Sequence, residues 1–272
     1  MKDKEQRLKA LVAQQGSMVV AYSGGVDSTY LAVIAHEVLG DRALAVTGVS
    51  PSLAQVEREE ATSLAQRFGF RHRLLETYEL DNPLYMANNT NRCFFCKDEL
   101  FGQLRQLAAQ EGYACVADGF NLDDLKDFRP GHKAGAKYHV LSPLNDAELT
   151  KVDIRSYSRE RGLPTWDKPA MACLSSRFPY GTPIDVESLR RIDTAETFLR
   201  GLGFRQLRVR HHDRIARIEV EPEDLPRLIE PQVRDQVVCK LRELGYLYIT
   251  LDLTGYRSGS LNEAVPHLTR KA

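Results

Sequence analysis

The sequence predicts an α/β fold in which helices cover a parallel β-sheet, followed by a smaller α+β domain. Three observations support this prediction. Short β-rich runs alternate with helical stretches over residues 18–160, a connection with four prolines interrupts them at 163–183, and a helix–strand pattern then occurs twice. Strands that alternate with crossover helices form parallel sheets covered on both faces, because each crossover lays a helix on the sheet.

The first region contains five predicted strands and five predicted helices. Each strand is a short run rich in apolar residues, and each helix places apolar residues near a 3.6-residue period. Charges interrupt the first helix, so it is amphipathic and lacks the unbroken apolar core of a signal peptide. The predicted strands cover 18–22, 43–48, 72–76, 114–118 and 138–142. The predicted helices cover 1–16, 28–39, 52–68, 92–111 and 148–161.

The second region repeats a helix, a Leu-Gly-aromatic stop and an alternating strand. The two copies cover 196–210 and 238–252, and a third strand is predicted at 214–220. This pattern indicates a small α+β domain. The expected organisation is a first domain over 1–165, an irregular connection over 166–183 and a second domain over 184–272.

The composition is that of a globular protein with balanced charge. Lysine plus arginine equals aspartate plus glutamate at 37 each, and 43% of the residues are hydrophobic. Proteins that grip nucleic acids usually carry a basic excess, so we expect no nucleic-acid partner. We also expect no membrane association, because no apolar run approaches the length of a membrane span. Five cysteines without a secretion signal favour reduced thiols and a cytoplasmic location.

The strongest chemical signal is AYSGGVDST, residues 21–29, which lies between a predicted strand and a predicted helix. Its glycines allow a tight turn with exposed N–H groups, and the helix dipole adds positive potential, so a phosphate could bind there. The alternative is a structural helix start with an Asp or Ser cap. Five fixed residues should coincide by chance in roughly one chain in a few thousand, which favours the functional interpretation. Asp27 could also hold Mg²⁺ through water. The predicted phosphate-binding residues are Ser23, Gly24, Gly25, Asp27 and Ser28.

SGGVDS resembles the PP-loop of the ATP pyrophosphatases, which have an adenine nucleotide α hydrolase-like parallel sheet. That superfamily adenylates a carboxylate or carbonyl, releases pyrophosphate, and passes the activated group to nitrogen or sulfur. Further segments resemble the LarE family, the sulfur transferases of nickel-pincer nucleotide synthesis, in the same order and over nearly the full length. These segments are DGFNLDD at 118–124, RPG at 129–131, CLSSRFPYGTP at 173–183, RVRHHDRIARIE at 208–219 and LDLTGYRSGSLN at 251–262.

The resemblance implies a PP-loop domain followed by a domain for substrate binding or oligomerisation, in a homo-oligomer. The implied substrate is a small nucleotide, pyridinium-3,5-biscarboxylic acid mononucleotide. ATP with Mg²⁺ would adenylate each carboxylate. Sulfide or another sulfur donor would then displace AMP to leave a thiocarboxylate. Conversion of a carboxylate oxygen into the leaving group AMP is what makes attack by a sulfur nucleophile possible.

The segment NRCFFCKD, residues 91–98, distinguishes this chain from the LarE type in which one cysteine gives up its own sulfur. It resembles instead a three-cysteine subset that carries a [4Fe–4S] cluster. Cys93 and Cys96 are three positions apart on a predicted helix and therefore share one face. With Cys173, the resemblance implies three catalytic cluster ligands and one open iron that can hold hydrosulfide.

Other interpretations of the cysteines stay open. Zn²⁺ could bind the same three thiols with a histidine, or the C-x-x-C pair could act as a redox dithiol or a persulfide relay. Cys173 could also be a sacrificial sulfur donor. Cys115 and Cys239 lie in predicted buried patterns, so we expect both to be core thiols.

Several charged residues are candidates for binding phosphate and carboxylate groups. Arg208 and Arg210 alternate on one predicted strand and so point to one face, and Arg257 lies in a predicted turn. Guanidinium groups match the geometry of both anions; the alternative is a solvated strand face. Asp118 and Asp124 could position Mg²⁺, although such turns are common without function. The family resemblance adds Ser176, Arg177 and Glu219 at the substrate and Glu196 as a catalytic residue.

Three rival functions remain. A PP-loop tRNA thiolase can also combine C-x-x-C with a third cysteine, but the neutral charge counts against RNA. An amidating PP-loop synthetase would leave the three cysteines unexplained. An ATP-binding sensor would release no pyrophosphate, which separates it from all the enzymes.

Overall fold

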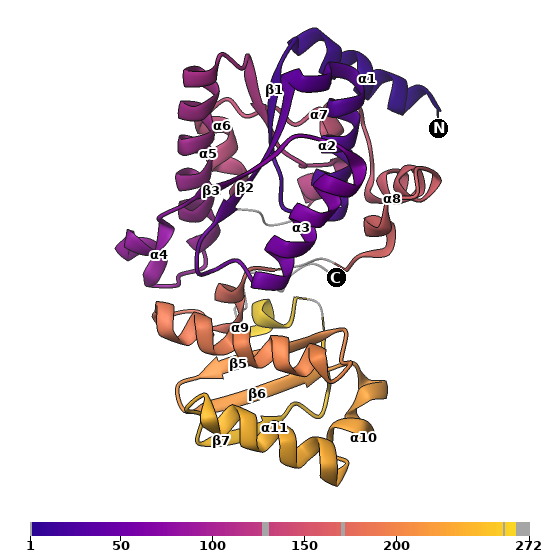
Figure 1. The fold of residues 1–272 in the computed structure, drawn as a ribbon. Helices are drawn as coiled ribbons and strands as arrows, with labels where there is room; N and C mark the ends of the chain where they lie inside the picture. Colours follow the sequence, from indigo (N-terminus) through magenta and orange to yellow (C-terminus); the bar gives the residue numbers. More distant parts are fainter. Residues whose placement is uncertain (1, 127–130, 170–171, 258, 265–272) are drawn as a thin grey trace. The chain divides into compact units, whose positions relative to one another are not determined.

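The computed structural model describes residues 2–126, 131–169, 172–257 and 259–264, in two compact units (Figure 1). The first unit comprises Met1–Asn82 and Asn91–Met171, and the second comprises Pro83–Thr90 and Ala172–Ala272. Most of the RPG sequence at 129–131 lies outside the described residues. No helix in the described ranges is long and apolar enough to cross a lipid bilayer.

The short segment Pro83–Thr90, which the sequence pattern places in the first domain, groups with the second unit. Its helix α4 spans Pro83–Met86. The Asn88 side-chain amide donates hydrogen bonds to the carbonyls of Pro179 (2.8 Å) and Thr182 (3.0 Å). These partners lie more than ninety positions along the chain, so no local pattern could reveal the grouping.

The first unit is built on a four-stranded sheet in which all strands are parallel. Four of the five predicted strands are confirmed. The fifth, at 138–142, is wrong, because only a single bridge joins Leu141 to Ala117. His139 has a positive φ of 52°, which interrupts the extended backbone that a strand needs. The strands are β1 (Met18–Ala21), β2 (Ala43–Val49), β3 (His72–Glu76) and β4 (Cys115–Ala117), in the order β3-β2-β1-β4.

Helices cover both faces of this sheet, as the alternation predicts (Figure 1). One face packs against α1, α2, α3 and α8, and the other packs against α5 and α6. Along β1, Met18 and Val20 face the first layer, whereas Val19 and Ala21 face the second. The helices are α1 (Lys2–Gln15), α2 (Val26–Leu39), α3 (Gln55–Phe68), α5 (Arg92–Glu111), α6 (Gly131–Lys137), α7 (Pro143–Asp146) and α8 (Lys151–Glu160).

The second unit is a three-stranded sheet with helices packed on one face. Leu207 and Val209 of β5 point into this helix-covered core, whereas Arg208 and Arg210 alternate with them toward the opposite face. β5 pairs antiparallel with β6, and β6 pairs parallel with β7. The elements are α9 (Val186–Gly201), β5 (Leu207–His212), β6 (Ile215–Val220), α10 (Leu225–Leu228), α11 (Pro231–Glu243) and β7 (Tyr248–Leu251).

Candidate functional site

The SGGVDS loop lies at the point where the strand order of the first unit reverses. β1 has β2 on one side and β4 on the other, and all three end at the same edge of the sheet. Ligands of open α/β sheets bind outside the carboxyl ends of the strands at such a switch point. A Cβ added to Gly119, just after β4, would lie 2.9 Å from the backbone nitrogen of Ser28. The two loops therefore contact each other at backbone distance.

The loop itself turns through a left-handed glycine directly before α2 begins. Gly24 has φ of 71°, and a Cβ there would lie 3.0 Å from the Ala61 Cβ. The Ser28 hydroxyl accepts from the Ser23 N–H (3.2 Å) and shares a hydrogen bond with the Ser23 hydroxyl (3.0 Å). Gly25 is the N-cap and offers no side-chain acceptor, so the first N–H groups of the helix remain available for an anion. The alternative of an Asp or Ser side-chain cap is wrong.

Asp27 has one carboxylate oxygen in use and one without a partner. Its Oδ2 pairs with the ammonium of Lys151, a residue that the sequence analysis missed. Within the described residues, its Oδ1 is buried and has no hydrogen-bond partner. Carboxylate oxygens are the ligands that Mg²⁺ prefers, so this orphaned atom fits a bound magnesium ion.

A second cation also reaches the loop. The Lys168 ammonium donates to the Gly24 carbonyl (3.2 Å) and pairs with Glu60 (2.7 Å). Lys151 and Lys168 both lie more than a hundred positions after the SGGVDS loop, so neither belongs to a recognisable loop motif. Only their common approach to one loop marks them.

The two other predicted magnesium ligands differ in their surroundings. Asp118, directly after β4, accepts hydrogen bonds from the Ser142 hydroxyl (2.9 Å) and the Phe120 N–H (3.2 Å). Asp124 is buried, and its Oδ2 accepts from the Asn121 N–H (3.2 Å). Asp118 thus lies at the end of β4, beside the SGGVDS loop, whereas Asp124 bonds within the turn that contains Asn121.

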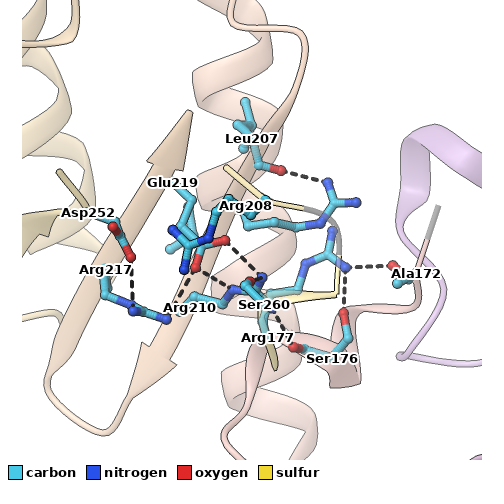
Figure 2. Close-up of polar contacts among 12 residues, drawn as sticks. Ala172, Ser176, Arg177, Leu207, Arg208, Arg210, Arg217, Glu219, Asp252 and Ser260 are labelled. Carbon is cyan, nitrogen blue, oxygen red and sulfur yellow. Dashed lines mark hydrogen bonds and ion pairs between the residues drawn. The ribbon is translucent and has the colours of Figure 1, made fainter. Parts of the chain in front are cut away.

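The second unit gathers buried charges on the sheet face opposite its core. Arg177 is fully buried, and Figure 2 shows its guanidinium bonded to Ala172 and Ser176, which flank Cys173 in the chain. Its Nε and Nη2 donate to the two carboxylate oxygens of Glu196 (2.8 and 2.9 Å). Its Nη1 donates to the carbonyls of Ala172 (2.5 Å) and Cys173 (3.0 Å) and to the Ser176 hydroxyl (2.9 Å). Arg177 therefore holds the backbone of the Cys173 loop.

The Glu196 carboxyl is kept ionised in this buried position. Burial by itself raises its pKa, but the charge and hydrogen bonds of Arg177, with weaker help from Arg200 and Arg208, hold the pKa below its usual value. Glu196 also accepts from the Val209 N–H (3.0 Å), so it ties α9 to β5.

Arg210 forms a second buried ion pair in the same cluster. Its Nε and Nη2 donate to Glu219 (2.9 and 2.8 Å), while Nη1 donates to the Ser176 carbonyl (2.8 Å) (Figure 2). Nη2 also reaches the Ser260 hydroxyl (3.0 Å). Arg217 joins the same carboxylate at 3.2 Å. The charge of Arg210 is thus neutralised within the protein.

Arg208 differs from Arg210 because no described carboxylate pairs with it. It is 4% exposed, donates to the Leu207 carbonyl (2.7 Å) and lies over the Tyr256 ring (5.0 Å). It forms no ion pair with any described residue. Burial, and then repulsion by Arg177, lower the pKa of its guanidinium. The alternative of a solvated strand face is excluded by this burial and by that of Arg210 (6%).

Arg257, unlike the arginines of these buried pairs, is exposed on the surface. Its guanidinium pairs with Glu263 (2.9 Å) and also contacts Thr254. It is the most exposed of the four arginines predicted at the substrate site.

The cysteines fall into two environments. Cys93 and Cys96 lie at the start of α5, where the first is exposed and the second half-buried, and Cys173 is half-buried in the second unit. Burial raises the pKa of the Cys115 thiol to about 11, as expected for a core residue. Cys239 is exposed and donates to Glu243 (3.6 Å), so the prediction of a core thiol there is wrong. No cluster of three or more His, Cys, Asp or Glu side chains able to hold a metal ion is found in the described part of the chain.

Comparisons with known proteins extend over both units. A family model described as NAD synthase matches residues 1–100. The chain is 46% identical to an uncharacterized protein of Synechocystis sp., over 97% of this chain and 99% of that protein. It is 36% identical to the pyridinium-3,5-bisthiocarboxylic acid mononucleotide synthase of Lactiplantibacillus plantarum, over 96% of this chain and 95% of the synthase. A tRNA-specific 2-thiouridylase of Desulforamulus reducens is 28% identical over 58% of this chain.

The span of these matches decides the assignment. The NAD synthase match ends at residue 100, so it includes the SGGVDS loop but not the buried arginine cluster, and the thiouridylase match covers little more than half of the chain. The match to the L. plantarum synthase extends over nearly all of both sequences, and so takes in the phosphate loop and the buried arginine cluster together. The chain therefore belongs to the LarE family of PP-loop proteins.

Proposed function

We propose that this protein is an ATP-dependent sulfur insertase that converts the carboxylates of pyridinium-3,5-biscarboxylic acid mononucleotide into thiocarboxylates. The observation that carries the proposal is the near full-length, 36% identical match to a synthase named for the bisthiocarboxylic acid product. A tRNA thiolase is less favoured, since the thiouridylase match covers only 58% of the chain.

The reaction divides into two balanced steps. In the first, a substrate carboxylate oxygen attacks the α-phosphorus of ATP, the bond to the β-phosphate breaks, and pyrophosphate leaves. In the second, a sulfur nucleophile attacks the acyl carbon and AMP leaves with both electrons of the carbon–oxygen bond. The loop around Gly24 and the start of α2 supply N–H donors for the pyrophosphate, and Asp27 and Asp118 are the carboxylates for Mg²⁺.

The substrate anions are assigned to the arginine cluster of the second unit. Arg208 is its leading ligand, because a buried guanidinium with no carboxylate partner in the described chain gains most from an incoming anion. Arg210 and Arg177 hold Glu219, Glu196 and the Cys173 loop in place around it. Ser176 and Arg257 complete the proposed substrate contacts.

The sulfur is proposed to come from a [4Fe–4S] cluster with Cys93, Cys96 and Cys173 as ligands. Cysteine thiolates are the usual ligands of such clusters, and all three thiols are at least partly accessible, unlike Cys115. When bound, the cluster supplies a renewable sulfur donor that spares the protein its own thiol. Zinc ligation and a sacrificial Cys173 are the alternatives. The enzyme is further proposed to be a cytoplasmic homo-oligomer.

The test is an anaerobic reaction with ATP, Mg²⁺, sulfide and pyridinium-3,5-biscarboxylic acid mononucleotide. We expect AMP and pyrophosphate in equal amounts and a product heavier by about 16 Da for each oxygen replaced by sulfur. Asp27→Asn should abolish both products and serves as the control. Substrate-dependent ADP formation in place of AMP, or AMP without any thiocarboxylate, would overturn the proposal.

A further inference from the structure

We propose that helix α8 delivers the cations that hold the ATP phosphates, with Lys151 and Lys168 as ligands and Arg155 as the residue that positions Lys168. The inference rests on the proposed use of ATP and deepens it. A triphosphate carries several negative charges, whereas SGGVDS contains one carboxylate and no cationic side chain. A Walker loop carries its own lysine, so here the positive charge must come from elsewhere in the fold.

Lys151 is held at the loop by its backbone as well as by its ammonium. Thr150 is the N-cap of α8, and its hydroxyl and the Asp153 carboxylate form a reciprocal capping box. The Lys151 N–H donates to Asp123 (2.9 Å), which anchors the first turn of the helix. From there the side chain, 38% exposed, reaches Asp27 in the first turn of α2. Because the backbone of Lys151 is anchored and its ammonium is partly exposed, the ammonium can turn from Asp27 to a phosphate at the same helix start.

Lys168 reaches the same loop at the Gly24 carbonyl. Its side chain is only 16% exposed, and Glu60 balances its charge at 2.7 Å. Arg155, one turn beyond the start of α8, fixes the backbone there: its Nη2 donates to the Lys168 carbonyl (2.9 Å) and its Nη1 to the Trp166 carbonyl. Helix α8 therefore carries Lys151 itself and positions Lys168 through the hydrogen bonds of the Arg155 guanidinium.

The two lysines contact different residues of the loop that leads into α2. Lys151 meets the loop at Asp27 and Lys168 meets it at Gly24, three positions apart. Phosphate oxygens bound at the start of α2 would be within reach of two ammonium groups, each able to donate up to three hydrogen bonds. Lys151 and Lys168 therefore supply the positive charges that bind the ATP phosphates and that the SGGVDS sequence lacks.

The experiment measures binding of Mg²⁺ with α,β-methylene-ATP, an analogue that cannot release pyrophosphate, by isothermal titration calorimetry. Lys151→Gln and Lys168→Gln should each raise Kd by about 10- to 100-fold, the loss expected for one charge-assisted contact. Binding of adenosine, followed by NMR, should stay unchanged because it has no phosphates. Lys137→Gln, which removes an exposed ion pair with Asp98, is the matched control and should bind the analogue normally.

Arg155 is tested by a double-mutant cycle. Arg155→Gln should weaken analogue binding, and combining it with Lys168→Gln should cost little more than Lys168→Gln alone, since both remove the same contact. Combined with Lys151→Gln, its effect should add. Wild-type affinity in both lysine variants, or equal losses of adenosine and analogue, would overturn the inference. The proposed function fails separately, if the wild type makes no thiocarboxylate whatever the variants bind.

Discussion

Arg208 and Arg210 lie on one strand but differ in their ion pairing, so one is expected to act in substrate binding and the other in stability. Arg208 is buried without a carboxylate partner among the described residues, whereas Arg210 is bonded to both oxygens of Glu219. Removing one member of a buried ion pair leaves the other charge desolvated, while removing an unpaired buried charge relieves a cost. The two residues look equivalent in sequence and should respond in opposite ways to substitution.

Arg210→Ala should therefore lower the free energy of unfolding by about 3 kcal/mol, because among the described residues Glu219 would keep an ion pair with Arg217 alone. Arg208→Ala should leave that free energy nearly unchanged and weaken substrate binding by about 1.5–3 kcal/mol. Urea denaturation and substrate titration measure the two effects. Equal stability losses in both variants would contradict the assignment of Arg208 to the substrate.

The ionised Glu196 makes a second prediction at the residue scale. Its pKa is lower in the folded protein than the ordinary value of 4.5, so deprotonation favours folding. The stabilisation is fully present above the unfolded pKa and is lost as pH falls through the lowered folded pKa. Glu196→Gln should flatten the pH dependence of the unfolding free energy below about pH 4.5. It should also lower stability at neutral pH by about 3 kcal/mol, since the buried ion pair between Arg177 and Glu196 is lost. A parallel pH profile in the variant would refute this role.

At the scale of elements, the turn between β1 and α2 depends on close backbone packing. Gly24 has φ of 71°, and any side chain there would press on Ala61 of α3. Gly16, with φ of 72°, has the same backbone conformation but nothing within 4 Å of an added Cβ. This pair separates the cost of the left-handed conformation from the cost of contact.

Gly24→Ala should lower stability by more than Gly16→Ala, which should cost about 1 kcal/mol through backbone strain alone. Because α3 would have to move away from the loop, Gly24→Ala should also weaken ATP binding, whereas Gly16→Ala should not. Thermal unfolding and nucleotide titration of both variants provide the measurement. Matching behaviour of the two alanines would show that Ala61 does not define the loop.

At the scale of the whole molecule, the sulfur source is the property to test. If Cys93, Cys96 and Cys173 bind the cluster, anaerobic protein should be brown and contain about four irons, and any of the three changed to Ala should lose colour and sulfur transfer together. Cys115→Ser and Cys239→Ser should retain both. Repeated turnover with sulfide is expected. A colourless protein that stops after one turnover and becomes lighter by about 34 Da at Cys173 would indicate a sacrificial thiol instead.

The sequence by itself determined the α/β architecture, the phosphate loop and the family. Each depends on residues close together in the sequence. The hydrophobic period specifies the strands and helices, and SGGVDS forms a phosphate-binding loop wherever it joins a strand to a helix. The strand expected at 138–142 failed because His139 adopts a positive φ, a feature that hydrophobic pattern does not carry.

Only the tertiary structure decided which charges work together. Lys151 and Lys168 approach the loop because parallel strands end at one edge of the sheet, which brings positions more than a hundred residues apart into contact. Likewise, Arg208 and Arg210 share a strand face, but only the packing of Glu219 against one of them separates a paired guanidinium from an unpaired one. Pairing of buried charges depends on distances between remote segments, and a linear pattern does not contain those distances.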